Sequence, residues 1–180
     1  MRGRMVGAGV TVLLVTGCGA EAEPVAVPPP APVAVAAASS GGACRLLDFG
    51  VIEQHAGFRF DVAAAGATGD SHTCVVRVGR ATLPELTLTV TETSIDAATF
   101  ASDVVPEKAA KVSGLGQRAY RRTTSAKGAL GPVVEVGWLA AEGRLATLRY
   151  ATPGDAGKAE AEKLTTALVA LARQLDTRAI

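Results

Sequence analysis

Glu85-Leu86-Thr87-Leu88-Thr89-Val90-Thr91 alternates strictly between polar and apolar residues. Successive side chains of a β-strand point to opposite faces of a sheet, so Leu86, Leu88 and Val90 share one face and the three threonines share the other. An apolar face opposite a hydroxyl face is typical of an antiparallel sheet that is covered on one side only. This stretch therefore predicts a strand that is half buried, with its threonines facing water.

The same two-residue period recurs elsewhere in the chain. It is clear in two runs near the C-terminal end, which the Glu142-Gly143 step separates as a hairpin turn would. It is equally clear in one run before residue 85, and weaker in two others. Together with 85–91 these runs predict about five to six antiparallel strands; the clear runs are 74–78, 134–138 and 146–150, and the weaker ones are 58–64 and 117–123.

Helical periods occupy the segments between and after the strands. Apolar residues at three- and four-residue steps predict a long helix over 155–175. Shorter helices are expected over 46–56, which Gly57 ends, and over 96–104, which Pro106 stops. The resulting order indicates an α+β fold, in which an antiparallel sheet of about five to six strands is covered by a long C-terminal helix and shorter helices.

Length and composition limit the number of domains and the class of protein. The 180 residues suffice for one domain with tails, 48% of them are hydrophobic, and the net charge is +1. This hydrophobic content excludes a wholly disordered chain, and the balanced charge offers no basis for binding nucleic acid. We expect a single folded domain that does not bind nucleic acid.

The N-terminus has the features of a bacterial lipoprotein signal peptide. Arg2 and Arg4 precede a mostly apolar run that is shorter than the roughly 20 residues a spanning helix needs. Val15-Thr16-Gly17-Cys18 resembles a lipobox, which implies cleavage after Gly17 and a diacylglyceryl group on the Cys18 thiol. Residues 1–17 are thus predicted to be a signal peptide, and Cys18 a lipid anchor on the outer face of the cell membrane. The alternative is an ordinary secretory signal with an incidental cysteine.

A proline-rich segment follows the lipobox. Residues 18–43 contain five of the nine prolines, no aromatic residue and no amphipathic period. Such a composition predicts a disordered, partly polyproline-II tether, which carries one α+β domain over 44–180.

Cys44 and Cys74 are the only cysteines after the lipobox, and we expect them to form a disulfide because exported domains fold in an oxidising compartment. A metal site would need further ligands, and His55 and His72, the only histidines, lack a recognisable zinc spacing. A catalytic cysteine would need a free thiol. We therefore expect neither a metal nor a cofactor.

Motifs of known enzyme classes do not occur. The chain has no Gly-x-Ser-x-Gly elbow and no His-Glu-x-x-His pair. Residues 154–158 resemble a phosphate loop only faintly, because the glycines are too close together. The sequence therefore favours a protein that is not an enzyme.

Two groups of polar residues are candidates for an interaction surface. If the strands at 74–78 and 85–91 are neighbours, Arg77 lies beside the row formed by Thr87, Thr89 and Thr91, and a protein or glycan is expected to dock there. A basic cluster would suit an anionic partner such as a phosphate head group. A solvated surface without a ligand is the alternative for both groups; the cluster comprises Arg118, Arg121, Arg122 and Lys127.

The layout of the chain resembles a family of actinobacterial lipoproteins known as domain of unknown function 3558. The residues that carry the resemblance are the lipobox at Cys18, the opening Cys44-Arg45-Leu46-Leu47, Cys74 about thirty residues later, and the run Val112–Tyr120 before the last strands. Val75 departs from the aromatic residue that often follows the second cysteine in that family. The resemblance implies a membrane-anchored lipoprotein, and it carries over no catalytic residue because that family has none assigned.

Three classes of function follow from these observations. The first is an exported, membrane-anchored lipoprotein whose domain binds an envelope protein, a glycan or a lipid without catalysis. The second is an envelope-surface enzyme without a recognisable motif, which a convergent polar cleft would indicate. The third is a structural envelope protein without a dedicated ligand. The hydroxyl face on a long tether favours the first.

Overall fold

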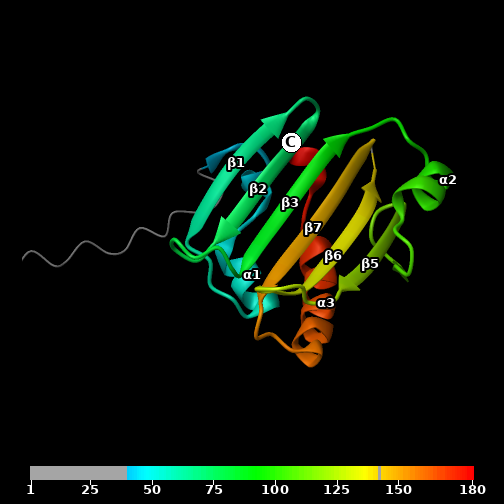
Figure 1. The fold of residues 1–180 in the computed structure, drawn as a ribbon. Helices are drawn as coiled ribbons and strands as arrows, with labels where there is room; N and C mark the ends of the chain where they lie inside the picture. Colours follow the sequence, from blue (N-terminus) through cyan, green and yellow to red (C-terminus); the bar gives the residue numbers. More distant parts are fainter. Residues whose placement is uncertain (1–39, 142) are drawn as a thin grey trace, which may run out of the picture. The chain divides into compact units, whose positions relative to one another are not determined.

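The computed structural model describes residues 40–141 and 143–180 (Figure 1). The predicted signal peptide, Cys18 and most of the predicted tether lie outside the described residues, as does Glu142 of the predicted hairpin turn. The elements in chain order are η2 (Gly42–Leu46), α1 (Phe49–Ala56), β1 (Val62–Thr68), β2 (Ser71–Arg77), β3 (Glu85–Glu92), α2 (Ala97–Thr99), η3 (Phe100–Val104), β4 (Ala110–Val112), β5 (Arg118–Thr124), β6 (Leu130–Ala140), β7 (Arg144–Pro153), α3 (Lys158–Ala172) and η4 (Thr177–Ala179).

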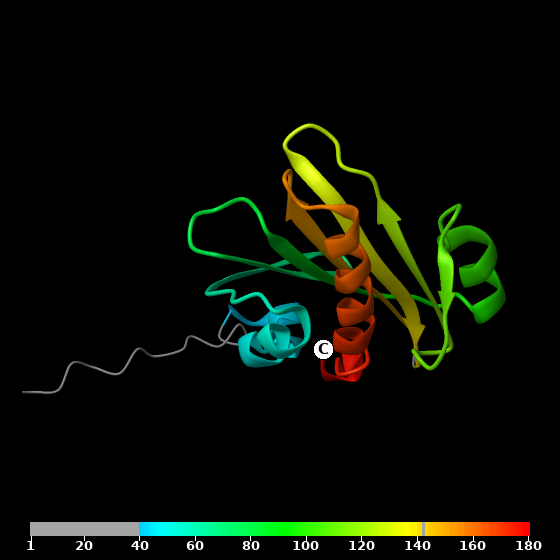
Figure 2. The same ribbon diagram turned by 90° about the horizontal axis from the view of Figure 1, so that it is seen from below.

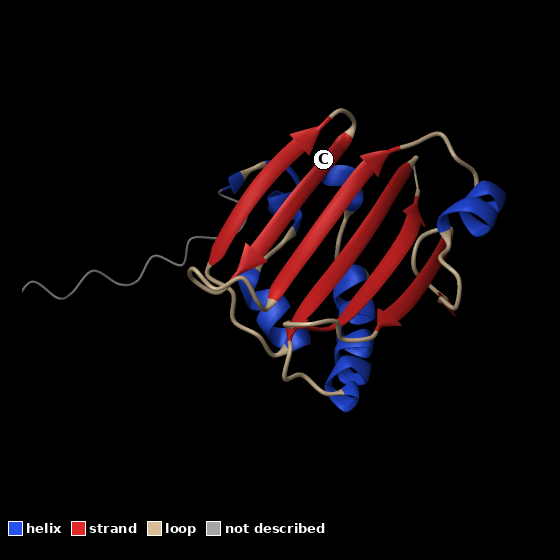
Figure 3. Cartoon of the chain, in the orientation of Figure 1, coloured by secondary structure: helices blue, strands red, loops and turns tan. Residues whose placement is uncertain are grey.

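One antiparallel sheet of seven strands forms the centre of the domain (Figure 3). Its order is β1-β2-β3-β7-β6-β5-β4, so two runs of hairpin-linked strands meet where β3 pairs with β7. The predicted α+β class is confirmed. The sheet has one strand more than expected because β4, at one edge, is only three residues long and shows no period of its own.

The helices α1 and α3 cover one face of the sheet (Figure 2). Leu86, Leu88 and Val90 point to this face and are at most 1% exposed, which confirms the predicted orientation of β3. The long C-terminal helix is confirmed as α3 over Lys158–Ala172, within the expected range. It contributes Leu164 and Leu168 to the core, and burial of such side chains from water is the main force that holds helix and sheet together.

The shorter helices begin and end as the sequence indicates. The side chain of Asp48 accepts a hydrogen bond from the Val51 N–H and caps α1, and Gly57 ends it in the left-handed conformation. Asp96 caps α2, which continues as the π-helical turn η3. Hydrogen bonds from Thr99 and from the Ala98 N–H hold the pKa of the Asp96 carboxyl below its ordinary value.

The predicted disulfide is confirmed: Cys44 in η2 is bonded to Cys74 in β2, and their Cα atoms lie 4.8 Å apart. Both cysteines are fully buried in the core. Ala43, which the sequence assigns to the tether, is fully buried beside them and belongs to η2. The packed part of the chain therefore includes Ala43, the residue just before Cys44.

Candidate functional site

The face of the sheet opposite α1 and α3 carries the threonine row. Strands β2 and β3 are neighbours, so the condition for the predicted surface is met. Their register places Thr87 opposite Val75, Thr89 opposite Thr73, and Thr91 opposite Ser71. The three threonines are half-buried by their neighbours, as expected for side chains that stand on an uncovered sheet.

Hydroxyl groups from three adjacent strands form a continuous patch on this face. Ser71 Oγ and Thr91 Oγ1 are hydrogen-bonded at 2.7 Å, and Thr73 Oγ1 and Thr89 Oγ1 at 3.3 Å. Across the next strand pair, Thr147 of β7 lies opposite Thr89. Each hydroxyl group can donate and accept hydrogen bonds, so the patch can donate hydrogen bonds to a ligand or accept them from it. We call it the hydroxyl field; it comprises Ser71, Thr73, Thr87, Thr89, Thr91 and Thr147.

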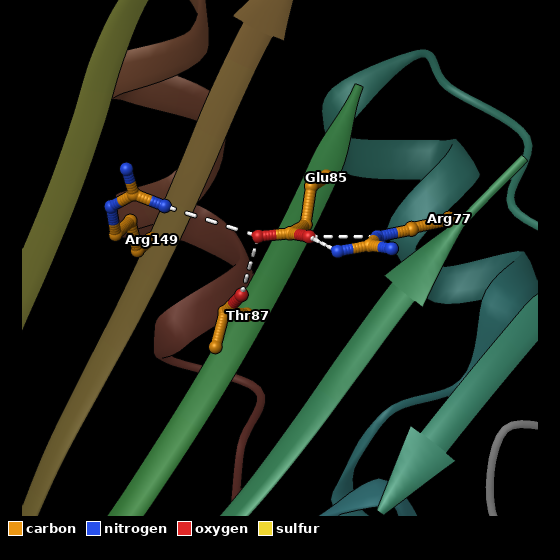
Figure 4. Close-up of polar contacts among 4 residues, drawn as sticks. All are labelled: Arg77, Glu85, Thr87 and Arg149. Atoms are coloured by element: carbon orange, nitrogen blue, oxygen red, sulfur yellow. Dashed lines mark hydrogen bonds and ion pairs between the residues drawn. The ribbon is translucent and has the colours of Figure 1, made fainter. Parts of the chain in front are cut away.

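An ion-pair network borders the hydroxyl field (Figure 4). Arg77 donates to Glu85 Oε2 through Nε at 2.7 Å and also through Nη2. On the other side of Glu85, the Arg149 Nη1 lies 4.0 Å from Oε1, and Thr87 donates to the same oxygen at 3.4 Å. The carboxylate is thus shared between two arginines, and the three side chains together keep one net positive charge at this border.

A second carboxylate has the same role further across the sheet. Arg122 Nη2 lies 3.3 Å from Glu135 Oε2, and the Tyr120 hydroxyl donates to Glu135 Oε1 at 2.9 Å. Burial, followed by the negative charge of Glu135, raises the pKa of Tyr120 above its ordinary value, so the phenol remains a hydrogen-bond donor. A side chain at Gly137 would collide with the Tyr120 ring, which lies across β6 at that point.

The segment α2–η3 covers the end of the face at β5 and β6. Phe100 packs on Tyr120 with their ring centroids 6.1 Å apart, and Leu139 completes this small second core. This cover is not evident from the sequence. Phe100 at the end of a short helical pattern is the only signal, and one aromatic residue does not indicate which face of a sheet it packs on.

The basic cluster does not form one patch. Arg118 and Arg122 lie on the same face of β5 as Tyr120, whereas Arg121 lies on the opposite face, which α3 covers. There Arg121 borders a shallow hollow of about 420 Å³ together with Thr165 and Glu162, and Arg122 also lines this hollow. The prediction that the three arginines form a common surface is therefore only partly met, because a run of adjacent residues in a strand divides between two faces.

The two histidines lie apart from the hydroxyl field. His55 lies in the last turn of α1, and His72 lies on β2 opposite Val90, on the face that packs against the helices. Within residues 40–141 and 143–180, no three side chains of the histidine, cysteine, aspartate or glutamate types gather as metal ligands would. Nor does any helix in that part of the chain combine the length and apolarity needed to cross a membrane.

The site is therefore a polar sheet face: a hydroxyl field between the ion-pair network of Arg77, Glu85 and Arg149 and the α2–η3 segment. Comparisons of the chain with protein-family models, with curated proteins and with solved structures find no match.

Proposed function

We propose that this chain is an exported, lipid-anchored binding protein without catalytic activity, and that the hydroxyl field binds a glycan. The observation that carries the proposal is the hydroxyl field itself. Six hydroxyl side chains lie on adjacent strands of one sheet, on the side away from the long helix. Such a rigid surface offers hydrogen-bond donors and acceptors at fixed positions.

The field itself carries hydroxyl groups and no charges, which favours a hydroxyl-rich ligand. At its border Arg77 and Arg149 are both engaged by Glu85, which leaves one net positive charge there. A protein partner is less favoured, because protein interfaces depend on a few aromatic and arginine anchors in apolar surroundings. The aromatic side chain nearest to the field is Tyr120, which is only 5% exposed. A glycan matches the hydroxyl groups without needing such anchors.

A non-catalytic role is supported by what the ionisable groups of this face do. Glu85 and Glu135 each accept hydrogen bonds from arginine side chains that border the field. Tyr120 is held protonated by burial and by Glu135. These groups are engaged with one another, and their role is to hold the strands in position beneath a ligand.

Export and anchoring rest on the sequence features described above. The lipobox-like Val15–Cys18 and the resemblance to the actinobacterial lipoprotein family support a lipid on Cys18. The Cys44–Cys74 disulfide is the bond expected of a domain that folds outside the cytoplasm. A Cys18→Ala variant should be released from the membrane fraction or remain unprocessed. Metabolic labelling with a palmitate analogue tests this, and an unlabelled wild-type protein in a lipidating host would refute the anchor.

Glycan binding is tested with the polysaccharide fraction of the producing cell's own envelope, immobilised as the probe. The double variant Thr87→Glu/Thr89→Glu places charges in the hydroxyl field, and we expect retention to fall by about tenfold or more because those charges must be desolvated on binding. Thr166→Glu, on an exposed position of α3, is the matched control and should bind as wild type does. Equal retention of wild type and the double variant, with both folded, would refute this role for the field.

A further inference from the structure

The strand β1 is a free edge of the sheet within the described part of the chain. It stands first in the strand order and pairs with β2 alone (Figure 1). The hydroxyl of Ser40 donates to the carbonyl oxygen of Ala63 at 3.0 Å. Backbone groups of alternate residues face the same side of an antiparallel strand, so Ala63, Ala65 and Ala67 direct their N–H and C=O groups outward. Ser40 already occupies the Ala63 carbonyl, so among the described residues the groups open to a neighbouring strand are the Ala63 N–H and the N–H and C=O groups of Ala65 and Ala67.

The sequence of β1 lacks the devices that protect exposed edges. Natural edge strands are commonly very short, or carry lysine, proline or inward-pointing charges that prevent pairing with another chain. The seven residues of β1, VAAAGAT, contain no charged residue and no proline. The opposite edge, β4, has three residues and carries Lys111. Of the two edges, β1 is therefore the one at which another strand can pair.

A hollow of about 310 Å³ lies on the open face next to β1. Its floor is formed by Val62, Ala64 and Val75, and its wall by the β2–β3 loop, Gly79–Ala81. The wall is held in place, because the Gly79 N–H donates to Asp61 Oδ1 at 2.6 Å and the Ala81 N–H to the Val78 carbonyl at 3.0 Å. The small side chain of Ala64 leaves room for a larger one from outside.

The surroundings of the hollow are apolar, its lining includes Arg77 and Arg80, and the Asp61 carboxylate next to it is engaged by the Gly79 N–H. Val62 and Val78 are 43% and 38% exposed, and both lie at this end of the β1–β2 hairpin. Arg80 lies exposed on the rim. Arg77 is already engaged by Glu85, whereas no carboxylate within 40–141 and 143–180 forms an ion pair with Arg80. An occupant with one apolar and one acidic side chain would match this surface.

We propose that β1 binds an extended segment of a partner protein, which adds to the sheet as an antiparallel eighth strand. The side chain opposite Ala64 is apolar and fills the hollow. The residue two positions later in the segment lies opposite Val62, on the same face, and its carboxylate pairs with Arg80. The recognised pattern is thus an apolar residue, any residue, then glutamate or aspartate. This inference concerns a different surface from the hydroxyl field and does not depend on it.

A second copy of this chain fits the hollow less well. Antiparallel pairing of two β1 strands about Ala65 would place Ala64 opposite Gly66 of the other copy. Neither residue reaches into the hollow, so an apolar space beside each strand would stay unfilled. A foreign segment with a leucine-sized side chain at this position fills it.

The probe is a fluorescein-labelled peptide, acetyl-TVTLTETV-amide, titrated with the full chain and followed by fluorescence anisotropy. We expect saturable binding that Ala65→Pro weakens by about tenfold or more, since proline removes the outward N–H. Proline is tolerated at an edge position whose N–H faces away from the sheet, so the variant should remain folded. Ala65→Ser keeps the N–H and is the matched control, with binding as in wild type.

The peptide itself supplies the same test without a variant. N-methylation of the threonine before its leucine removes the N–H that donates to the Ala65 carbonyl, and should weaken binding to the wild type by about tenfold or more. Replacing its glutamate by lysine should weaken binding to the wild type. The Arg80→Glu variant should reverse this preference and bind the lysine peptide more tightly than the glutamate peptide.

Several results would overturn the proposal. One is no saturable binding of the glutamate peptide at concentrations up to about 1 mM, the limit of weak specific recognition. Another is binding that neither Ala65→Pro nor N-methylation affects. A dimer in sedimentation velocity that Ala65→Pro dissociates would assign the edge to a second copy instead. Binding that appears only after removal of the residues before Ser40 would assign it to the chain's own upstream segment. Unchanged peptide binding by Thr89→Glu, whose position lies opposite Thr73 and away from the floor of the hollow, separates this test from that of the hydroxyl field.

Discussion

Arg77 and Glu85 lie directly opposite each other on β2 and β3, and the guanidinium donates through Nε and Nη2 to one carboxylate oxygen. The Glu85 side chain is only 17% exposed, and it also faces Arg149. It is therefore the shared centre of the network and not one half of an isolated surface pair.

Glu85→Gln should lower the free energy of unfolding by about 1 kcal/mol, because it leaves two arginines close together without their carboxylate. Urea unfolding followed by circular dichroism measures the change. The control is Glu53→Gln, which removes the partner of Arg59 in a far more exposed pair and should change stability by only a few tenths of a kcal/mol. Equal effects of the two substitutions would contradict the assigned role of Glu85.

Gly137→Ala should destabilise the domain by about 1–3 kcal/mol, since a methyl group there collides with the Tyr120 ring. Gly66→Ala is the control, because a methyl group at that position meets nothing within 4 Å. Adding Tyr120→Ala to Gly137→Ala should recover part of the loss relative to the sum of the two single variants. Strictly additive losses would show that the collision is not the cause.

Two tyrosine-to-phenylalanine substitutions should have opposite effects. The Tyr150 hydroxyl is buried and has no hydrogen-bond partner among the described residues, so Tyr150→Phe should be neutral or stabilising. Tyr120→Phe removes the hydrogen bond to Glu135 and should cost about 1 kcal/mol. Thermal unfolding of the two variants beside wild type decides the matter. A loss at position 150 as large as that at position 120 would mean that a partner for the Tyr150 hydroxyl exists.

Reduction of the Cys44–Cys74 disulfide should lower the melting temperature. The bond closes a loop with a sequence separation of 30 residues, which corresponds to about 3.5 kcal/mol of loop entropy in the unfolded chain. Calorimetry with and without reductant measures the shift, and the double variant Cys44→Ala/Cys74→Ala should not respond to reductant. Mass analysis of the unreduced digest should show the linked peptides, and two freely alkylated thiols would contradict the bond.

The acid side of the stability profile should depend on Asp176. Hydrogen bonds from Arg178 lower the pKa of this carboxyl from 3.8 to about 2. A lowered folded-state pKa means that the stabilisation is present above pH 3.8 and is lost as the pH falls towards 2. The Asp176→Asn variant should therefore lose less stability than wild type between about pH 4 and 2, as measured by urea midpoints. Parallel pH profiles would refute the contribution.

The sequence predicts those parts of the fold in which the two faces of an element differ chemically. In β3 the alternation of leucine or valine with threonine determines both the strand and its orientation, and the confirmed burial of Leu88 follows from it. The first strand was placed too early, at 58–64, because Val62–Thr68 consists almost wholly of small residues and shows no alternation. With three residues, β4 is too short for any period.

The candidate site was predictable only in part. Arg77 and the threonines were placed correctly because they belong to two clearly periodic strands whose pairing a hairpin implies. Thr147 was missed because its strand reaches β3 only through the long-range pairing of β3 with β7, which no local pattern encodes. The cover by Phe100 was missed for the same reason, since it depends on a contact with Tyr120 on another part of the sheet.

The pairing of β3 with β7 also constrains how the molecule is made. The hairpin-linked strands on either side of it close over short loops, which form quickly, whereas this junction joins Glu92 to Arg144 across the whole second half of the sheet. A chain that emerges N-terminus first, from the ribosome or through a membrane, can pair β1 with β2 and β2 with β3 early. The other edge of β3 then stays unpaired until β7 has emerged, and during that time its backbone groups and its leucines can bind other chains. The completion of the sheet is therefore set by the delivery of residues 144–153, and a pause in synthesis before them prolongs the period in which the nascent chain can aggregate.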